Sequence, residues 1–261
     1  MSGYKDNLNE INGLNQRGGR MLSIIDLLEK KTLNIDLAAY LLVAISEGAS
    51  FLCCALKGGV GKTALMGALL GLVPSSEKIV SISSSRMIGE LKQGSRDSSS
   101  LCYVVHEIGS GSWFGYLWGP PVLEYLSLED EMTRVVSNIH ADTYDQVMEQ
   151  ITSFGGSESD LEHFDLILFI SLTGKKHGYE RARVVNQVLE TSRKEGKSHE
   201  VIYQHAGGKI RKEKEGRYSH LSSKLSLAYD FLTEMLENEI FHLDEIMPRL
   251  QKLHEEFRTL K

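Results

Sequence analysis

Apolar residues along the chain form short runs of strand length that alternate with segments of helical spacing. The apolar runs occupy residues 51–56, 78–82, 101–107, 134–139 and 165–170. The segments with helical spacing occupy residues 21–29, 37–45, 63–72, 122–128 and 147–154. Strands that alternate with helices in this way predict an α/β fold with a mostly parallel sheet and flanking helices.

The two ends of the chain differ from this pattern. Residues 1–20 are polar, with several Asn and Gly residues, and predict a flexible segment. Residues 181–189 alternate like a further strand, and residues 201–203 and 209–210 predict a small hairpin around Gly207-Gly208. From residue 219 the leucines keep helical spacing, and we expect Pro248 to interrupt or kink a C-terminal pair of helices.

Composition and charge narrow the class of protein. The 261 residues are 41% hydrophobic and 25% charged, which suits a globular domain with a large core. A net charge of −6 argues against a nucleic-acid partner. Cys53, Cys54 and Cys102 lie in apolar runs and predict buried thiols in a reducing compartment. The first residues lack a signal-peptide pattern and polar residues interrupt the longest apolar region, so we expect no membrane span and a cytoplasmic protein.

The stretch Leu56-Lys57-Gly58-Gly59-Val60-Gly61-Lys62-Thr63 joins the first apolar run to the helix that follows it. It predicts a phosphate-binding loop, because glycines let backbone N–H groups approach phosphate oxygens at a positively polarised helix N-terminus. We expect Lys62 to reach the terminal phosphates of ATP or ADP, and Thr63 to ligate Mg²⁺. The binding segment extends from Lys57 to Ala64. It departs from the usual pattern, which has a glycine at position 56 and no lysine at position 57.

Two polar residues follow directly after apolar strands. Glu107 ends the third apolar run, where such sheets place an acid beside the Mg²⁺ and the attacking water, and it is predicted to act as the base or to position the water. His140 follows the fourth run and lies at the same predicted sheet edge, ahead of a helix that Asp142 is expected to cap. The alternatives are an ordinary charged strand end and a structural histidine.

The segment from Gly109 to Pro121 (residues 109–121) is rich in glycine and aromatic residues, including Trp113, Phe114, Tyr116 and Trp118. It is either an ordered, partly buried surface loop or an insertion that faces a protein partner. The sequence leaves both interpretations open.

The order of these motifs resembles the motor domain of the secretion ATPases, the family that drives type II and type IV secretion, type IV pili and archaeal flagella. Val104-Val105-His106-Glu107 resembles the Walker B stretch, which usually ends Gly-Glu, and Asn138-Ile139-His140-Ala141-Asp142-Thr143 resembles the histidine box. Arg181 and Arg183 resemble the arginines of a strand near the family's C-terminus. The resemblance covers roughly residues 15–210.

This resemblance implies a RecA-like P-loop NTPase that hydrolyses ATP in a hexameric ring. It further implies that His140 senses the γ-phosphate and that Arg181 or Arg183 reaches a neighbour's phosphates. We therefore expect a flexible N-terminal segment (1–20), a P-loop ATPase domain (21–218) and a C-terminal helical appendage (219–261). Lys62, Glu107 and His140 are the predicted catalytic residues.

Two other readings come from particular residues. The phosphate loop, with its extra Lys57, also resembles that of the partition and septum-site ATPases, which would make the protein a dimeric ATPase. Ser83-Ser84-Ser85 occupies the place of the acidic box of the secretion ATPases, with Glu90 as the next acid. A slow enzyme, or a nucleotide-binding scaffold or sensor that does not hydrolyse ATP, would explain this substitution.

Overall fold

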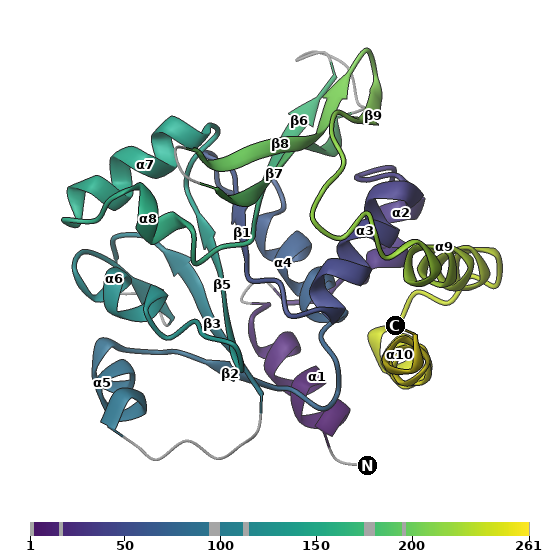
Figure 1. Cartoon of the computed structure of the whole chain (residues 1–261), viewed down its shortest axis with the longest axis horizontal. Helices are drawn as coiled ribbons and strands as arrows, with labels where there is room; N and C mark the ends of the chain where they lie inside the picture. Colours follow the sequence, from purple (N-terminus) through teal and green to yellow (C-terminus); the bar gives the residue numbers. More distant parts are fainter. Residues whose placement is uncertain are drawn as a thin grey trace.

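A computed structural model describes residues 3–15, 18–93, 100–111, 115–174, 181–194 and 197–260. Within these ranges nine strands form one mixed sheet in the order β2-β3-β5-β1-β6-β7-β8-β9, and β4 pairs with β3 outside this path (Figure 1). The strands are β1 (Phe51–Cys54), β2 (Lys78–Ser81), β3 (Leu101–Ile108), β4 (Tyr116–Leu117), β5 (Thr133–Ile139), β6 (Leu166–Thr173), β7 (Ala182–Lys194), β8 (Lys197–Ala206) and β9 (Lys209–Lys212).

The strands from β2 to β6 run parallel, whereas β7, β8 and β9 continue the sheet antiparallel. The parallel part brings the carboxyl ends of β1, β3 and β5 to one edge of the sheet, because β1 lies next to β5 and β5 next to β3. The predicted α/β class with a mostly parallel sheet is confirmed. Each of the five predicted strands is present, as is the hairpin around Gly207-Gly208.

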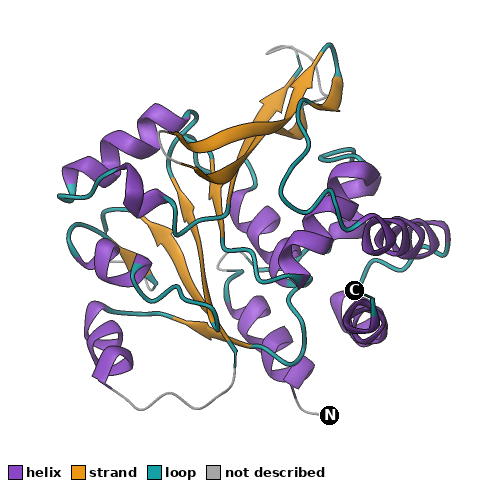
Figure 2. Ribbon diagram, in the orientation of Figure 1, coloured by secondary structure: helices purple, strands orange, loops and turns teal. Residues whose placement is uncertain are grey.

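Helices cover both faces of the sheet (Figure 2). On one face lie α5 (Ser85–Gln93), α6 (Pro121–Leu126), α7 (Tyr144–Ser153) and α8 (Glu158–Leu161). On the other lie α1 (Gly3–Gly13), α2 (Ile24–Glu29), α3 (Ile35–Ser46), α4 (Lys62–Leu70), α9 (Ser222–Glu237) and α10 (Leu243–Thr259). Each face has its own hydrophobic core, because successive side chains of a buried strand point to opposite sides of the sheet.

The N-terminal segment is not the flexible tail that its polar composition predicts. Residues 3–13 form α1, which packs beside the edge strand β2. Asn7 donates from its side-chain amide to the Glu77 carbonyl (2.8 Å) and accepts from the Ile79 N–H (2.9 Å). Ile11 is fully buried in the same interface. The helix thus satisfies backbone groups of an edge strand, which a composition argument cannot detect.

The C-terminal helices belong to the main core. Ala228 and Leu232 of α9 and Ile246 of α10 are buried in the same cluster as α3, against which α9 packs. Pro248 does not interrupt the helices, because residues 238–242 separate α9 from α10 and Pro248 lies inside α10. A kink at Pro248 stays a prediction. The turn uses a left-handed Glu239, with φ of 54°.

Two further expectations can be compared with the structure. Thr143, and not Asp142, caps α7 by accepting a hydrogen bond from the Gln146 N–H. The three cysteines are buried free thiols, as predicted. None of the helices in the described ranges combines the length and the apolar character needed to cross a membrane.

Candidate functional site

The loop between β1 and α4 contains the predicted phosphate-binding residues. Gly59 and Gly61 have φ of 80° and 121°, a region that L side chains rarely adopt. A Cβ atom on Gly61 would also lie only 3.2 Å from the Arg183 side chain. Gly61 is the N-cap residue of α4 and supplies no capping side chain, so the first N–H groups of this helix lack a side-chain acceptor. This is the backbone arrangement that receives phosphate oxygens.

The loop borders a cavity of about 670 Å³, within the usual range for small-molecule sites. Its lining comes from the glycine loop, the first turn of α4, the ends of β3 and β5, Asn15 and the segment 20–32. The predicted residues among this lining are Gly58, Gly59, Gly61, Lys62, Thr63, Ala64, Glu107, His140 and Arg183. The structure therefore gathers most of the predicted site around one space.

Lys62 is the first residue of α4 and is buried. Its Nζ donates a hydrogen bond to the Ala55 carbonyl (3.2 Å) and lies 3.6 Å from Glu107 Oε1. The same Nζ lies 3.1 Å from His140 Nδ1. Three residues that are far apart in sequence thus meet at the carboxyl edge of β1, β3 and β5.

Glu107 and His140 form a close contact. Nδ1 of His140 lies 2.7 Å from the Leu56 carbonyl, which can only accept, so Nδ1 carries a hydrogen. The other ring nitrogen, Nε2, lies 2.5 Å from Glu107 Oε1. The imidazole of His140 therefore connects the start of the glycine loop to the carboxylate at the end of β3.

Glu107 is the one acidic residue in the described lining of this cavity. Its second oxygen, Oε2, accepts from the Tyr116 hydroxyl at 3.4 Å. Glu90 does not take the place of the missing acidic box, because it pairs with Arg86 at 2.8 Å on the exposed face of α5. Any carboxylate chemistry in the cavity therefore depends on Glu107.

The predicted nucleotide-binding cations divide between two places. Arg183, on β7, lines the phosphate-loop cavity and donates from Nη2 to the Gly59 carbonyl at 3.3 Å. Lys57, Val60 and Arg181 instead line a separate cavity of about 430 Å³ on the other side of the loop. Lys57 is exposed and is not among the described residues that line the phosphate-loop cavity.

A magnesium ion needs few protein ligands when a nucleotide supplies others. Thr63 lines the cavity one residue after Lys62 and offers one hydroxyl oxygen. The described residues contain no group of three or more His, Cys, Asp or Glu side chains that could hold a metal alone. This donor set fits Mg²⁺, which commonly keeps several waters and is bound through one or two protein oxygens together with substrate phosphates.

The sequence did not predict the part of the site that comes from the N-terminal region. Met21, Leu22 and Leu27 form an apolar wall of the cavity. Arg20 positions this segment through two hydrogen bonds to the buried Asp26, of 2.6 and 2.5 Å. The capping box of Ser23 and Asp26 at the start of α2 was a local signal that could have indicated an ordered segment here.

Two other contacts also escaped prediction. Asp142 Oδ1 accepts from the Leu56 N–H at 2.7 Å and so ties the end of β5 to the start of the phosphate loop. Asn138, buried in β5, donates from Nδ2 to the His106 carbonyl at 2.8 Å. Both contacts hold the carboxyl edge of the sheet together, and each joins residues more than thirty positions apart.

Part of the aromatic segment 109–121 folds back onto the site. Tyr116 lies on β4, which pairs with the end of β3 opposite Glu107. Trp118 packs edge-on against Phe154, with ring centroids 4.6 Å apart, and remains 45% exposed. Trp113 and Phe114 lie outside the described residues, as do Arg17 and Lys175-Lys176. A protein partner for this segment stays a prediction.

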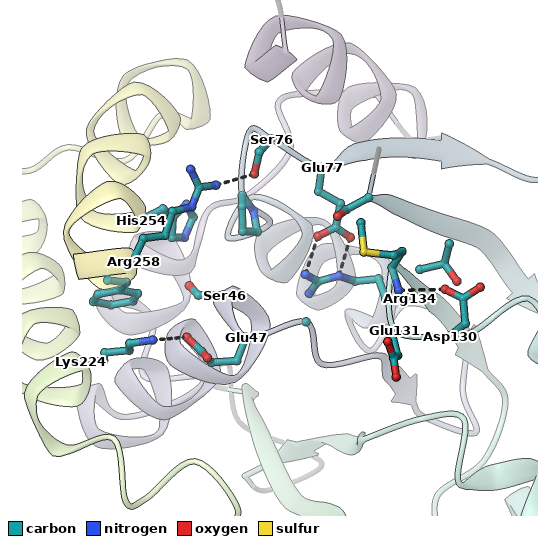
Figure 3. Close-up of a pocket in the computed structure, with 16 residues that line it drawn as sticks. Ser46, Glu47, Ser76, Glu77, Asp130, Glu131, Arg134, Lys224, His254 and Arg258 are labelled. Atoms are coloured by element: carbon teal, nitrogen blue, oxygen red, sulfur yellow. Dashed lines mark hydrogen bonds and ion pairs between the residues drawn. The ribbon is translucent and has the colours of Figure 1, made fainter. Parts of the chain in front are cut away.

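A third cavity, lined by polar residues, lies at the opposite, amino end of the strands (Figure 3). Several of its charges are paired with one another: Arg134 forms a bidentate pair with Glu77 (2.6 Å), and Lys224 contacts Glu47 at 2.7 Å. Arg258 of α10 donates to Ser76 at 2.7 Å. We interpret this region as the contact that joins α10 to the sheet, since none of the predicted site residues lies there.

Comparison with protein-family models gives no match, and comparison with curated proteins gives no significant match.

Proposed function

We propose that this protein binds Mg²⁺–ATP in the phosphate-loop cavity and hydrolyses it to ADP and phosphate. The observation that carries this proposal is the convergence of Lys62, Glu107 and His140 beside the uncapped start of α4. Phosphate loops of this kind pair an ammonium and a helix N-terminus, which stabilise phosphate charge, with a carboxylate that orients water. The RecA-like form of the fold is part of the same proposal.

The chain offers a role for each part of the nucleotide. Lys62 and the first N–H groups of α4 bind the terminal phosphates, and Arg183 adds a second positive charge to the same cavity. Met21, Leu22 and Leu27 supply an apolar wall on which a nucleobase can pack. Glu107 holds the attacking water and accepts its proton as the new bond to phosphorus forms and the bond to the leaving ADP oxygen breaks. Mg²⁺, held by Thr63 and the phosphates, neutralises charge on the phosphate oxygens.

Assembly and location are also proposals. The resemblance to secretion ATPases supports a homo-oligomeric ring, acting in the cytoplasm. The exposed Arg181, which lies outside the phosphate-loop cavity of its own chain, is then free to approach the phosphates of a neighbour. The exposed Lys57 has that role only in the partition-type dimer. Measurement of the mass in solution with and without Mg²⁺-ATP tests this: a hexamer supports the ring, and an ATP-dependent dimer supports the partition-type alternative.

A second candidate is a nucleotide-binding scaffold or sensor without turnover. It is favoured by the single carboxylate among the described residues that line the cavity, and by the serines that follow β2 in place of an acidic box. The two candidates share nucleotide binding and differ only in phosphate release.

Calorimetry with ATP and ADP tests the shared step. Lys62→Ala should abolish binding in a folded protein, because Lys62 supplies the ammonium that faces the terminal phosphates. The matched control is Lys57→Ala, which removes an equal charge outside the cavity and should keep binding. Equal affinities of the wild type and Lys62→Ala would remove the phosphate-loop proposal altogether.

A further inference from the structure

His106 stands directly before Glu107, at the position where the Walker B stretch of the secretion ATPases usually has glycine. It lies on β3, lines the phosphate-loop cavity and is only 7% exposed. A buried, ionisable ring in this place requires a physical explanation, since burying a polar group costs free energy unless it forms hydrogen bonds.

The structure fixes the tautomer of His106. Nε2 lies 3.1 Å from the Leu14 carbonyl, an acceptor, so Nε2 carries the hydrogen. Burial lowers the pKa of the imidazole, which keeps the ring neutral at pH 7. Nδ1 is therefore an unprotonated acceptor, and it has no hydrogen-bond partner among the residues that the structure describes. Such an atom is unfavourable while it stays unpaired, because burial has removed its hydrogen bonds to water.

The ring is held in the same part of the cavity as the Glu107 carboxylate. It stacks on Tyr116, with ring centroids 5.8 Å apart and an interplanar angle of 16°. Tyr116 in turn donates to Glu107 Oε2. Asn138 holds the His106 carbonyl from the neighbouring strand. Both the backbone and the ring of His106 are thus fixed beside the carboxylate.

Space beside Glu107 is created by the step that binds the nucleotide. Lys62 now lies against the Ala55 carbonyl, 3.6 Å from Glu107 Oε1. When its ammonium moves to the phosphates, it leaves a polar volume next to Glu107. Water that fills this volume lies near the acceptor atoms of Glu107 and His106, and acceptors orient the hydrogens of a water molecule.

We propose that His106 Nδ1 is a second acceptor for the attacking water, which donates one hydrogen to Nδ1 and the other to Glu107. This rests on the proposed ATP hydrolysis and adds a water-positioning residue to it. With both hydrogens of the water directed towards these two acceptors, the lone pairs of its oxygen face the γ-phosphorus. The oxygen forms the bond to the γ-phosphorus, the proton passes to Glu107, and ADP leaves with the electrons of the broken bond.

The alternative is a purely structural histidine that holds the end of α1 through Leu14. Two substitutions separate these roles. In His106→Asn the amide oxygen can occupy the place of Nδ1, but the contact with Leu14 is lost. In His106→Gln the amide nitrogen can occupy the place of Nε2 and donate to Leu14, but the acceptor is lost. Circular dichroism establishes that each variant is folded.

The measurement is steady-state phosphate release beside ATP affinity for the wild type and both variants. We expect His106→Gln to lower turnover by about tenfold or more with little change in affinity, and His106→Asn to stay close to the wild type. Unchanged turnover in His106→Gln contradicts the proposal, and so does a loss in His106→Asn as large as that in His106→Gln.

A second measurement does not depend on turnover. The ¹⁵N resonance of His106 Nδ1, assigned by its absence from the spectrum of a folded His106 variant, should move towards that of a hydrogen-bonded nitrogen when Mg²⁺ and a non-hydrolysable ATP analogue bind. A resonance that does not move overturns the proposal, even where the wild type shows no turnover. Failure of the proposed function is distinct from both results, because the wild type would then bind neither ATP nor the analogue.

Discussion

Glu107 Oε1 lies 2.5 Å from His140 Nε2, and this contact joins the carboxyl ends of the neighbouring strands β3 and β5. The imidazole is held from its other side by the Leu56 carbonyl at the start of the phosphate loop. In the proposed function, a change at the γ-phosphate would reach the carboxylate through the two nitrogen atoms of this ring. This relationship makes His140 a partner of Glu107 and gives a physical basis for the expected sensing role.

The first prediction concerns His140. His140→Ala should slow ATP turnover by less than the ~10²-fold expected for loss of the base, because Glu107 keeps its contacts with Lys62 and Tyr116. Nucleotide affinity should change little. Phosphate release and calorimetry on the same preparation measure both quantities, and a loss of turnover as large as that of Glu107→Gln would make His140 part of the chemical step.

The second prediction concerns Arg183, Arg181 and Lys57, which the sequence analysis assigned together to nucleotide binding. Arg183→Ala should weaken ATP binding, because Arg183 lines the phosphate-loop cavity. Arg181→Ala and Lys57→Ala are matched controls that line the neighbouring cavity, and each should keep ATP affinity. Complete loss of activity in Lys57→Ala together with loss of an ATP-dependent dimer would instead favour the partition-type ATPase.

The third prediction concerns the buried pair of Arg134 and Glu77, whose side chains are 3% and 8% exposed. Arg134→Met should lower the free energy of unfolding by about 3–5 kcal/mol, since it leaves a buried carboxylate without its partner. Urea denaturation measures this change. The double variant with Glu77→Gln removes the stranded charge and should recover part of the loss, whereas an unchanged midpoint in Arg134→Met would contradict the assignment.

The fourth prediction is a pH dependence that arises from His254 in α10. Burial, together with the nearby Arg258 and Arg134, lowers the pKa of this imidazole to about 4. In the unfolded chain His254 therefore binds a proton near pH 6.5, whereas in the folded chain it does so only near pH 4. The contribution of His254 to the free energy of unfolding is fully present above pH 6.5 and is lost as the pH drops towards 4. The loss is about 2 kcal/mol between pH 7 and 5.

His254→Gln is the control for this pH effect, because it keeps a polar side chain that does not titrate. Denaturation at pH 7 and pH 5 should show a smaller pH dependence for His254→Gln than for the wild type. The buried His106 and the partly buried His199 also have lowered pKa values and contribute equally to both proteins, so they cancel in this difference. Identical pH dependence in the two proteins would show that His254 does not titrate in this way.

Local patterns predicted much of the fold because they reflect burial. The runs that ended in Glu107 and Ile139 are apolar since both faces of a central parallel strand are covered, and the glycine loop has a fixed order of residue types. The sequence failed where the cause is a contact between distant segments. Asn7 pairs with β2 some seventy residues away, and Met21 reaches the cavity through a turn held by Arg20 and Asp26. No local periodicity encodes such contacts.

The site was predicted to a similar extent and for the same reason. Lys62, Glu107 and His140 could be placed together because each adjoins the end of a parallel strand. The separation of Arg183 from Arg181 could not be predicted, since it depends on which side of the phosphate loop each side chain reaches. The acceptor on His106 depends on the Leu14 carbonyl, which lies ninety-two positions earlier.

Steady-state phosphate release by the wild type and Glu107→Gln, measured beside ATP affinity, tests the central claim most directly. Gln keeps the shape of the side chain and removes the group that accepts the proton of the attacking water. We predict that Glu107→Gln binds ATP as the wild type does. Its rate of phosphate release should be lower by ~10²-fold or more. Equal turnover in the two proteins would contradict the catalytic assignment, and a wild type that binds ATP without releasing phosphate would replace the ATPase with the non-hydrolysing scaffold.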